Sequence, residues 1–310
     1  YYAGLADKEE GAVLPADKKD MMAFTRLEPL GVVAAIVPWN SPLLLTAWKL
    51  APALAAGNTV VIKPSEFTST SIAPFLELVR EAGFPPGVVN AVTGNGPDVG
   101  AALVEHPLVR AVAFTGGEVA GMAIAETAGR RLIPLTLELG GKSANIVFED
   151  ADIARAVNGI VGGIFAATGQ TCVAGSRLLV HRSIAQEVIE KVVALARSAR
   201  IGDPMEAATQ VGPVTTEAQM GKILRHIEDA KAAGASVLLG GGRAVGGICD
   251  QGWFVQPTIF GDVRPDMRLA QQEVFGPVLA VLPFDTEEEA LSLANDTDYG
   301  LAAGVWTRDL

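Results

Sequence analysis

Short apolar runs alternate with amphipathic stretches along most of the chain. Val32–Val37 is a continuous apolar run, which is typical of a parallel strand covered on both faces. Ser41-Pro42 follows as an N-cap and a first helical residue, and Gly57-Asn58 is expected to end that helix. The same rhythm predicts strands at 59–62, 88–92 and 111–114, with helices at 72–82 and 98–105. This order predicts an α/β unit with a parallel sheet and helices on both faces.

A second series of elements begins near Glu138. A helix from Gly121 to about Ala128 precedes the stretch 132–139, which Pro134 interrupts. Further strands are expected at 146–148, 178–181, 237–239, 254–259 and 278–282, with helices from 153, over 184–199 and over 222–233. We therefore predict a second α/β unit after the first.

Length and composition agree with two globular domains. The chain has 310 residues, against ~150 per domain. With 24 Lys and Arg against 35 Asp and Glu, the net charge is −11, and no basic run is present, so nucleic acid and anionic membranes are poor partners. A hydrophobic content of 49% with 19% charged residues excludes a disordered chain. Two cysteines exclude a disulfide scaffold, and three scattered histidines give no metal site.

The uncharged stretch 156–176 is long enough by count to span a bilayer. It carries several polar residues and glycines, which are costly or weakly helical there, so we interpret it as protein interior. No basic-then-apolar signal segment opens the chain, and the cysteine usage fits a reducing compartment. We therefore expect a cytoplasmic protein.

Cys172 is the strongest candidate for chemistry. It ends Gly169–Cys172, a turn rich in Gly, Gln and Thr between a predicted helix and a predicted strand. Most free cysteines are small buried thiols, which is the structural alternative. The turn suits a presented nucleophile better than a packed side chain. Cys249, in the glycine-rich stretch Gly246–Cys249, is expected in a surface loop without function.

Glu138 ends an apolar run and meets Gly140-Gly141. A carboxylate at the end of a buried strand costs desolvation energy unless it is used or paired. Burial makes a carboxylate a stronger base, which suits general-base chemistry. A strand-end carboxylate satisfied by its neighbours is the alternative.

Two turns after predicted strands favour a nucleotide. Phe114–Gly117 follows a strand and enters a helix that contains Gly121, a spacing that differs from G-x-G-x-x-G. A glycine turn at a helix N-terminus still presents backbone N–H groups to a phosphate. Lys63–Glu66 follows another strand end, where ligands bind in open α/β sheets, and its charges suit a ribose. A solvated loop is the alternative for both.

Together these motifs resemble the NAD(P)-dependent aldehyde dehydrogenase superfamily. They occur in the family order, with 34 residues from Glu138 to Cys172. The matching blocks are Val37–Asn40, Lys63–Glu66, Phe114–Gly116, Leu137–Lys142, Gly169–Cys172 and Glu273–Pro277. The resemblance implies a Rossmann-like, parallel-sheet cofactor-binding domain over 1–137 and an α/β catalytic domain over 138–310.

The resemblance also implies catalytic roles for four residues. Cys172 resembles the nucleophile that attacks the aldehyde and forms a thiohemiacetal, which is oxidised to a thioester. Asn40 resembles the amide that stabilises the oxyanion together with the Cys172 N–H. Glu138 resembles the base that activates water for hydrolysis of the thioester to a carboxylic acid. Lys49 resembles a lysine of the family's proton path.

NAD is the implied cofactor, with NADP as an alternative. Glu66 favours NAD because it would accept from the ribose hydroxyls and repel a 2′-phosphate. Many relatives have Ser where this chain has Gly117, which removes one hydroxyl contact and keeps the backbone donors. The residues matched to cofactor contacts are Val37, Pro38, Trp39, Lys63, Ser65, Glu66, Gly96, Gly100, Phe114, Thr115, Gly116, Gly117, Leu139, Gly140, Glu273 and Phe275.

Two other functions compete with hydrolytic aldehyde oxidation. One is a CoA-acylating aldehyde dehydrogenase, whose members tend to lack the glutamate at position 138. The other is a structural or binding relative without chemistry, which the intact Cys172, Glu138 and Asn40 disfavour. The small and apolar residues near Cys172 suit aliphatic, aromatic and semialdehyde substrates alike.

The resemblance finally implies an assembly. The segment 11–29 matches an oligomerisation hairpin, so we expect a homodimer or homotetramer. Family members are longer at both ends, so we expect this chain to represent only part of one.

Overall fold

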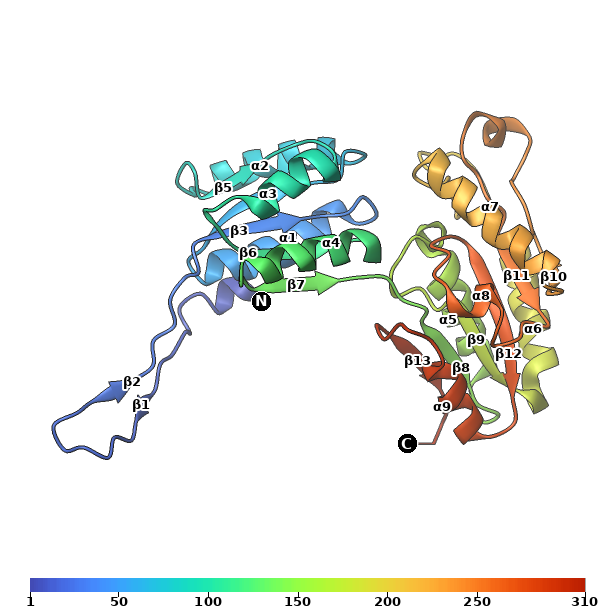
Figure 1. The fold of residues 1–310 in the computed structure, drawn as a ribbon. Helices are drawn as coiled ribbons and strands as arrows, with labels where there is room; N and C mark the ends of the chain where they lie inside the picture. The colour runs from blue at the N-terminus through green and yellow to red at the C-terminus, as the bar shows by residue number, and fades with distance from the viewer. Residues whose placement is uncertain (310) are drawn as a thin grey trace. The chain divides into compact units, whose positions relative to one another are not determined.

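The computed structural model describes residues 1–309. The chain folds into two compact units, Tyr1–Leu139 and Gly140–Leu310, of which Leu310 lies outside the described residues (Figure 1). The division falls directly after Leu139, the last residue before the Gly140-Gly141 pair.

The first unit is built on a parallel sheet. Its strands are β3 (Val32–Ile36), β4 (Thr59–Lys63), β5 (Val89–Ala91), β6 (Val109–Thr115) and β7 (Leu135–Glu138). They lie in the order β5-β4-β3-β6-β7, and every neighbouring pair is parallel. The helices are α1 (Pro42–Ala55), α2 (Ile72–Glu81), α3 (Ala101–Glu105) and α4 (Glu118–Arg130).

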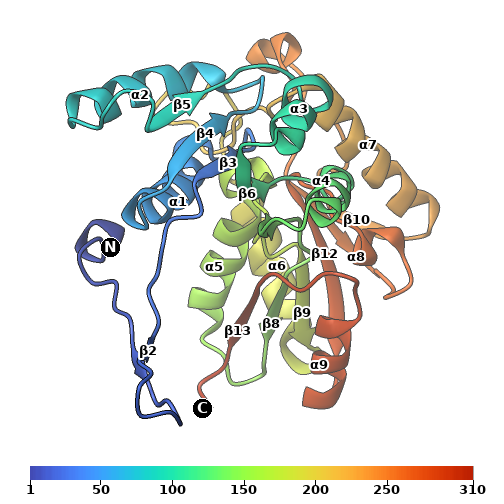
Figure 2. The same ribbon diagram turned by 60° about the vertical axis from the view of Figure 1, so that its left-hand side comes forward.

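The central strand β3 shows why both faces of this sheet are covered. Val33 and Ala35 pack with α1 and α2 on one face. Ala34 and Ile36 pack with residues of α3 and α4 on the other. Figure 2 shows α1 and α2 on one side of β3 and α3 and α4 on the other. Because successive side chains of a strand point to opposite faces, an uninterrupted apolar run can serve both layers. The predicted doubly covered sheet is confirmed.

A short hairpin precedes this sheet. A 3-10 turn, η1 (Tyr2–Gly4), is followed by β1 (Val13–Leu14) and β2 (Ala23–Phe24), which pair antiparallel. Val13 is 75% exposed and Phe24 is 63% exposed. The segment expected to form a hairpin at 11–29 therefore does so and presents apolar side chains.

The second unit holds a six-stranded mixed sheet. Its strands are β8 (Ala144–Val147), β9 (Arg177–His181), β10 (Ser236–Leu239), β11 (Thr258–Gly261), β12 (Val278–Phe284) and β13 (Ala303–Trp306). They lie in the order β10-β11-β12-β9-β8-β13, in which β10 is antiparallel to β11 and the others are parallel. The helices are α5 (Ile153–Phe165), α6 (Arg182–Arg197), α7 (Glu217–Ala232), α8 (Arg268–Gln271) and α9 (Glu287–Asn295).

This sheet too is covered on both faces. Leu178 and Val180 of β9 pack with α5 and α6, whereas Leu179 packs with α7 and α8. The stretch expected to be protein interior, 156–176, begins on α5, whose buried face includes Ile160 and Ile164. Among residues 1–309, no helix is long and apolar enough to cross a membrane.

Several element boundaries differ from the sequence predictions. The helix expected at 98–105 is a π-type turn, η3 (Gly96–Gly100), followed by α3, because Asn95 caps the chain early by accepting from the Asp98 N–H. Helix α4 begins at Glu118, before Gly121. The strand expected at 254–259 begins only at Thr258.

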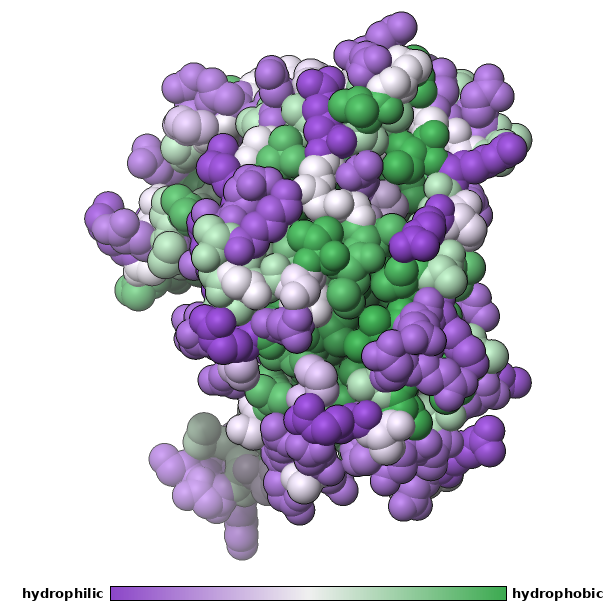
Figure 3. Space-filling view, turned by 90° about the vertical axis from the view of Figure 1, so that its right-hand side faces the viewer, coloured by the Kyte–Doolittle hydropathy of each residue, from purple (hydrophilic) through white to green (hydrophobic). Residues whose placement is uncertain are grey.

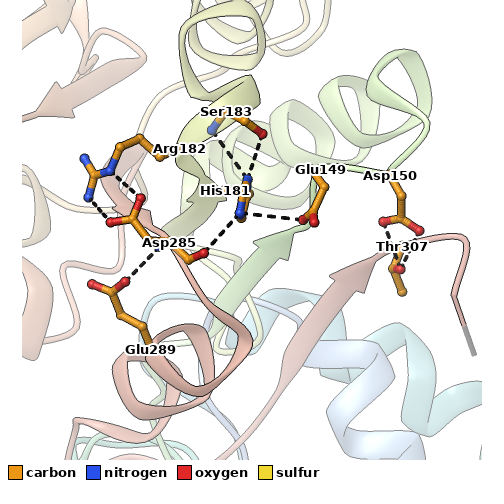
Figure 4. Close-up of polar contacts among 8 residues, drawn as sticks. All are labelled: Glu149, Asp150, His181, Arg182, Ser183, Asp285, Glu289 and Thr307. Carbon is orange, nitrogen blue, oxygen red and sulfur yellow. Dashed lines mark hydrogen bonds and ion pairs between the residues drawn. The ribbon is translucent and has the colours of Figure 1, made fainter.

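The carboxyl edge of the second sheet is closed by polar contacts (Figure 4). Arg182 donates two hydrogen bonds to Asp285, from Nε at 2.7 Å and from Nη2 at 2.9 Å. Asp150 accepts from the Thr307 hydroxyl and from the Arg308 N–H at 2.7 Å, and the Arg308 N–H is the largest cause of the lowered pKa of Asp150. These contacts fasten the loops that follow β8, β9, β12 and β13.

A buried arginine fastens α9 to the sheet. Arg177 opens β9, and its guanidinium donates to the backbone carbonyls of Lys142, Leu293 and Ala294 at 2.7–2.8 Å. Leu293 and Ala294 lie in the last turn of α9, whose carbonyl groups have no partner within the helix. Arg177 therefore caps α9 from the interior of the unit.

The second unit also carries an exposed apolar face. Figure 3 views the molecule from the right-hand side of Figure 1. Hydrophobic side chains gather in the middle of this face, with polar side chains around them. Val237, Val245 and Trp253 are among the exposed apolar residues of this unit. Grouped apolar surface of this kind is typical of a contact surface.

His226 is a buried titratable residue of the second unit. It is buried on α7, and its Nδ1 has no hydrogen-bond partner in the described part of the chain. Burial, then the positive charge of Arg268, lowers the pKa of His226 from 6.5 to about 4, and Lys142 and Lys222 act in the same direction against Asp229.

We expect His226→Leu to flatten the acid dependence of stability. The unfolded chain binds the proton near pH 6.5 and the folded chain only near pH 4. The free energy of unfolding of the natural protein should therefore fall as the pH is lowered from 6.5 to 4. Urea unfolding between pH 7 and pH 4 measures this, with the exposed His106→Leu as control. An unchanged pH dependence in His226→Leu would contradict it.

Candidate functional site

Three turns of the second unit meet at one edge of its sheet. Gly140-Gly141 precede β8, Cys172 precedes β9, and Glu273 to Gly276 precede β12. These strands are neighbours in the order β12-β9-β8 and run parallel. The segments that enter parallel neighbouring strands lie at the same edge, so the topology gathers residues that are more than 130 positions apart in sequence.

Close backbone contacts fix these turns against one another. The Gly141 N–H donates to Glu273 Oε1 at 3.0 Å. A Cβ added to Gly141 would lie 2.9 Å from the Cys172 carbonyl oxygen, and one on Gly140 would lie 2.6 Å from Glu273 Oε2. Gly141 is therefore required by space, whereas a side chain at position 140 would displace the Glu273 carboxylate. The Gly140-Gly141 turn touches both the cysteine turn and the glutamate.

The turn that leads to Cys172 has an unusual backbone. Ala167, Thr168 and Gly169 have φ angles of 49°, 57° and 68°, in the left-handed region. A Cβ on Gly169 would lie 2.1 Å from the Gly276 carbonyl oxygen. Cys172 itself is half-buried. The turn therefore separates Cys172 from the end of α5 and presses against the turn before β12.

A pocket is lined by the same turns. Its walls include Gly141, Thr171, Glu273 and Phe275. Phe275 has a φ of 57°, another strained position for a residue with a side chain. Left-handed conformations in non-glycine residues persist only where the surroundings hold them, and they cluster at functional sites.

A buried lysine lies behind this edge. Lys142 is 2% exposed, and its Nζ has no hydrogen-bond partner in the residues that the structure describes. Burial, then the positive charge of Arg177, lowers the pKa of Lys142 from 10.5 to about 7, while Glu273 acts against them. Lys142 therefore loses much of its charge near neutral pH.

In the first unit, the candidate site residues lie where the strands end, at the carboxyl edge of the sheet. Asn40 follows β3, Lys63 ends β4, Thr115 ends β6 and Glu138 ends β7. All these strands are parallel, so their carboxyl ends lie together, at the edge where open α/β sheets bind ligands. Val37, Pro38 and Trp39 lie beside Asn40 in the same loop.

The turn after β6 fits a phosphate group. Helix α4 begins after Gly117, an N-cap residue that has no side chain to accept from the first N–H groups. The Gly116 N–H donates to the Glu138 carbonyl at 3.1 Å, which holds this turn to the end of β7. A Cβ on Gly121 would lie 2.7 Å from Leu139 Cδ2, so a larger residue here would displace the Leu139 side chain.

Lys63 and Glu66 are partners after β4. Lys63 is 3% exposed, and its Nζ donates to the Pro64 carbonyl at 2.8 Å and lies 3.9 Å from Glu66 Oε2. Burial lowers the pKa of Lys63, and Glu66 raises it. Ser65, which lies between these two residues in the sequence, is also buried. Gly100, at the end of η3, lies against the Lys63 side chain, whereas Gly96 at its start is exposed.

Lys49 lies inside the first unit. This residue of α1 is buried, and its Nζ donates to Thr115 Oγ1 at 2.6 Å. Burial lowers the pKa of Lys49, and the negative charge of Glu138 acts in the opposite direction. Thr115, expected only as a cofactor contact, is therefore also the partner of Lys49.

Two sequence predictions are wrong. Glu138 is exposed, because it shares with Thr136 the exposed face of the edge strand β7, whereas Leu135 and Leu137 face the core. Cys249 is 7% exposed in the 3-10 turn η5 (Gly247–Gln251), where it packs with Ala244 and Phe254, and is no surface residue.

Sequence reasoning missed the residues that hold the turns. Gln170 accepts from the Thr215 N–H at 2.9 Å, and Gln219 of α7 donates to the carbonyls of Val274 and Phe275. A glutamine in a loop carries no sequence signal for such a contact. Within residues 1–309, no group of His, Cys, Asp and Glu could hold a metal ion.

Comparison with known proteins gives a consistent family. The model of the "Aldehyde dehydrogenase family" matches residues 1–310. Mitochondrial aldehyde dehydrogenase of Sus scrofa is 50% identical over all of this chain and 59% of its own, and chloroplastic betaine aldehyde dehydrogenase of Beta vulgaris is 47% identical over 62% of its own length. The chain thus spans about three fifths of these relatives.

Solved structures of aldehyde dehydrogenases have the same fold as this chain. The NAD+ complex of aldehyde dehydrogenase from Bacillus cereus matches with a TM-score of 0.96 and 47% identity, covering all of this chain and 62% of that one. Betaine aldehyde dehydrogenase from Staphylococcus aureus, in complex with NAD+, matches with a TM-score of 0.97 and 42% identity, covering 61% of that chain.

We expect Gly169→Ala to destabilise the second unit. A side chain at this left-handed φ is disfavoured by ~1–2 kcal/mol, and the added Cβ would clash with the Gly276 carbonyl. Gly162→Ala on α5, where nothing lies within 4 Å of the added Cβ, should be neutral or stabilising. Denaturant unfolding of both variants tests this, and equal stabilities would refute it.

Proposed function

This chain belongs to the aldehyde dehydrogenase family, and we propose that it oxidises an aldehyde to a carboxylic acid with NAD as the acceptor. The observation that supports this best is the edge of the second unit, where the Cys172 turn meets Gly141 and the turn of Glu273 and Phe275. Aldehyde, NAD and water would give carboxylic acid, NADH and a proton.

Cys172 is the proposed nucleophile. Its thiolate would attack the carbonyl carbon, and the Asn40 amide and the Cys172 N–H would stabilise the oxyanion of the resulting thiohemiacetal. Loss of hydride from that carbon would leave a thioester on Cys172. When bound, NAD would supply the hydride acceptor. The substrate class remains any small aldehyde that fits beside the small and apolar residues of this turn.

The first unit fits the dinucleotide. The uncapped N-terminus of α4 after Gly116-Gly117 suits the pyrophosphate. Lys63, Ser65 and Glu66 suit the hydroxyls of the adenosine ribose. Gly100 lies against the Lys63 side chain, and Gly96, at the other end of η3, is a further proposed contact of the cofactor. In the second unit, Glu273 suits the hydroxyls of the nicotinamide ribose. The remaining proposed contacts are Val37, Pro38, Trp39, Phe114, Thr115, Leu139, Gly140 and Phe275.

Glu138 is the proposed general base. Its carboxylate would take a proton from the water that attacks the thioester, which releases the acid and restores the thiol. Lys49 would accept the proton that Glu138 takes from the water. The negative charge of Glu138 acts on Lys49, whose Nζ donates to the Thr115 hydroxyl at 2.6 Å. Its lowered pKa makes proton exchange easier than for an exposed lysine. Glu138 also favours water over CoA as the acyl acceptor.

We further propose a homo-oligomer in a reducing compartment, the cytosol in the first instance. The exposed apolar residues Val13 and Phe24 of the β1–β2 hairpin support self-association. Relatives bear both mitochondrial and chloroplastic names, so the family itself does not determine the compartment.

We expect Cys172→Ala to abolish NADH formation from aldehyde while nucleotide binding persists, because no other nucleophile is proposed. Asn40→Ala should lower kcat by about 10²–10³-fold, the usual loss for one oxyanion donor. NADH absorbance and nucleotide titration of the full-length protein measure both. Ordinary turnover by the Cys172 variant would contradict the mechanism.

We expect Glu138→Gln to slow hydrolysis more than oxidation. Glutamine keeps the shape of the side chain but cannot take a proton, and loss of a general base costs about 10²–10⁴-fold in the affected step. Stopped-flow mixing with NAD and aldehyde should show a burst of NADH and then a slow steady state. Glu105→Gln, at an exposed carboxylate that ends α3 and has no proposed role, is the matched control. A steady state at the natural rate would remove Glu138 from the mechanism.

A further inference from the structure

We propose that Gln170 is a positioning residue that keeps Cys172 reactive by holding the strained turn before it. The inference rests on the proposed function, in which Cys172 is the nucleophile, and it concerns how the chain makes that thiol available.

The turn needs an external constraint. Ala167 and Thr168 have side chains and left-handed φ angles, and such residues are disfavoured without compensation. Helix α5 ends at Phe165, directly before this segment. An extended helix would carry Cys172 away from the edge at which Gly141 contacts it.

One segment supplies the constraint. Gln170 is buried, its Oε1 accepts from the Thr215 N–H at 2.9 Å, and its Nε2 donates to the Ala167 carbonyl at 3.3 Å. The Thr168 hydroxyl donates to the Gly212 carbonyl at 3.2 Å. Gln170 thus joins the strained turn to the loop segment 212–215, which we call the brace.

The brace is itself anchored. Thr216 caps α7 by accepting from the Gln219 N–H, and Gln219 donates to the carbonyls of Val274 and Phe275. The Val214 N–H donates to the Trp253 carbonyl at 2.9 Å. The brace therefore holds the cysteine turn and the Phe275 turn in one arrangement, and Gly169 packs directly on Gly276.

Alkylation of Cys172 by iodoacetamide tests the proposal without any dehydrogenase assay. Gln170→Met keeps the length of the side chain but removes the hydrogen bonds to Ala167 and Thr215. In the full-length protein we expect the rate constant at Cys172 to fall by about fivefold or more across the pH profile, which is the scale of one lost hydrogen bond. Gln186→Met on the exposed face of α6 is the matched control, and peptide mass spectrometry separates Cys172 from the buried Cys249.

A second variant distinguishes positioning from general loss of structure. Ala167→Gly lowers the cost of the left-handed backbone, so adding it to Gln170→Met should restore part of the alkylation rate. Natural reactivity in Gln170→Met, or no recovery in a folded double variant, would overturn the proposal. If the natural protein forms no NADH from aldehydes although Gln170→Met slows alkylation as expected, the proposed oxidation is contradicted and the positioning role of Gln170 stands.

Discussion

The direction of parallel strands is the constraint on which the rest of the structure depends. In the first unit, it brings the loops after β3, β4, β6 and β7 to one edge, with Asn40, Lys63, Thr115 and Glu138. In the second unit, it brings together the turns before β8, β9 and β12. The chain passes from the first edge to the second within Glu138 to Gly141. Sheet topology thus collects residues that are remote in sequence and presents both sets on backbone that strands support.

Backbone proximity then determines which residue types can stand in the turns. Gly141 lies against the Cys172 carbonyl and Gly169 against the Gly276 carbonyl, at separations that exclude a Cβ. These contacts fix the backbone of the turns that carry Cys172 and Glu273. Ala167, Thr168 and Phe275 have left-handed backbones in these turns. Gln170, which accepts from the Thr215 N–H, and Gln219, which donates to the Phe275 carbonyl, hold the turns in place. Stability and reactivity are therefore linked at the same turns.

The sequence alone predicted what local pattern encodes. The apolar run Val32–Val37 and the cap at Ser41-Pro42 defined β3 and α1 closely, since both signals act within a few residues. Burial of Glu138 and exposure of Cys249 were predicted wrongly, because strand order and packing with Phe254 are long-range properties. The contact from Gln170 to Thr215 spans 45 positions and has no periodic signature. Neighbouring residues therefore identify elements and motifs, whereas supports for the site depend on tertiary contacts.

The central claim is that Cys172, held at this edge, forms a covalent bond with the aldehyde carbon. The most direct measurement is mass spectrometry of the natural full-length protein, quenched in acid during turnover with aldehyde and NAD. The account predicts that the peptide containing Cys172 gains the mass of the aldehyde less two hydrogens, as a thioester requires, and only when NAD is present. An adduct on another residue, or turnover without any adduct under slow-hydrolysis conditions, would contradict it.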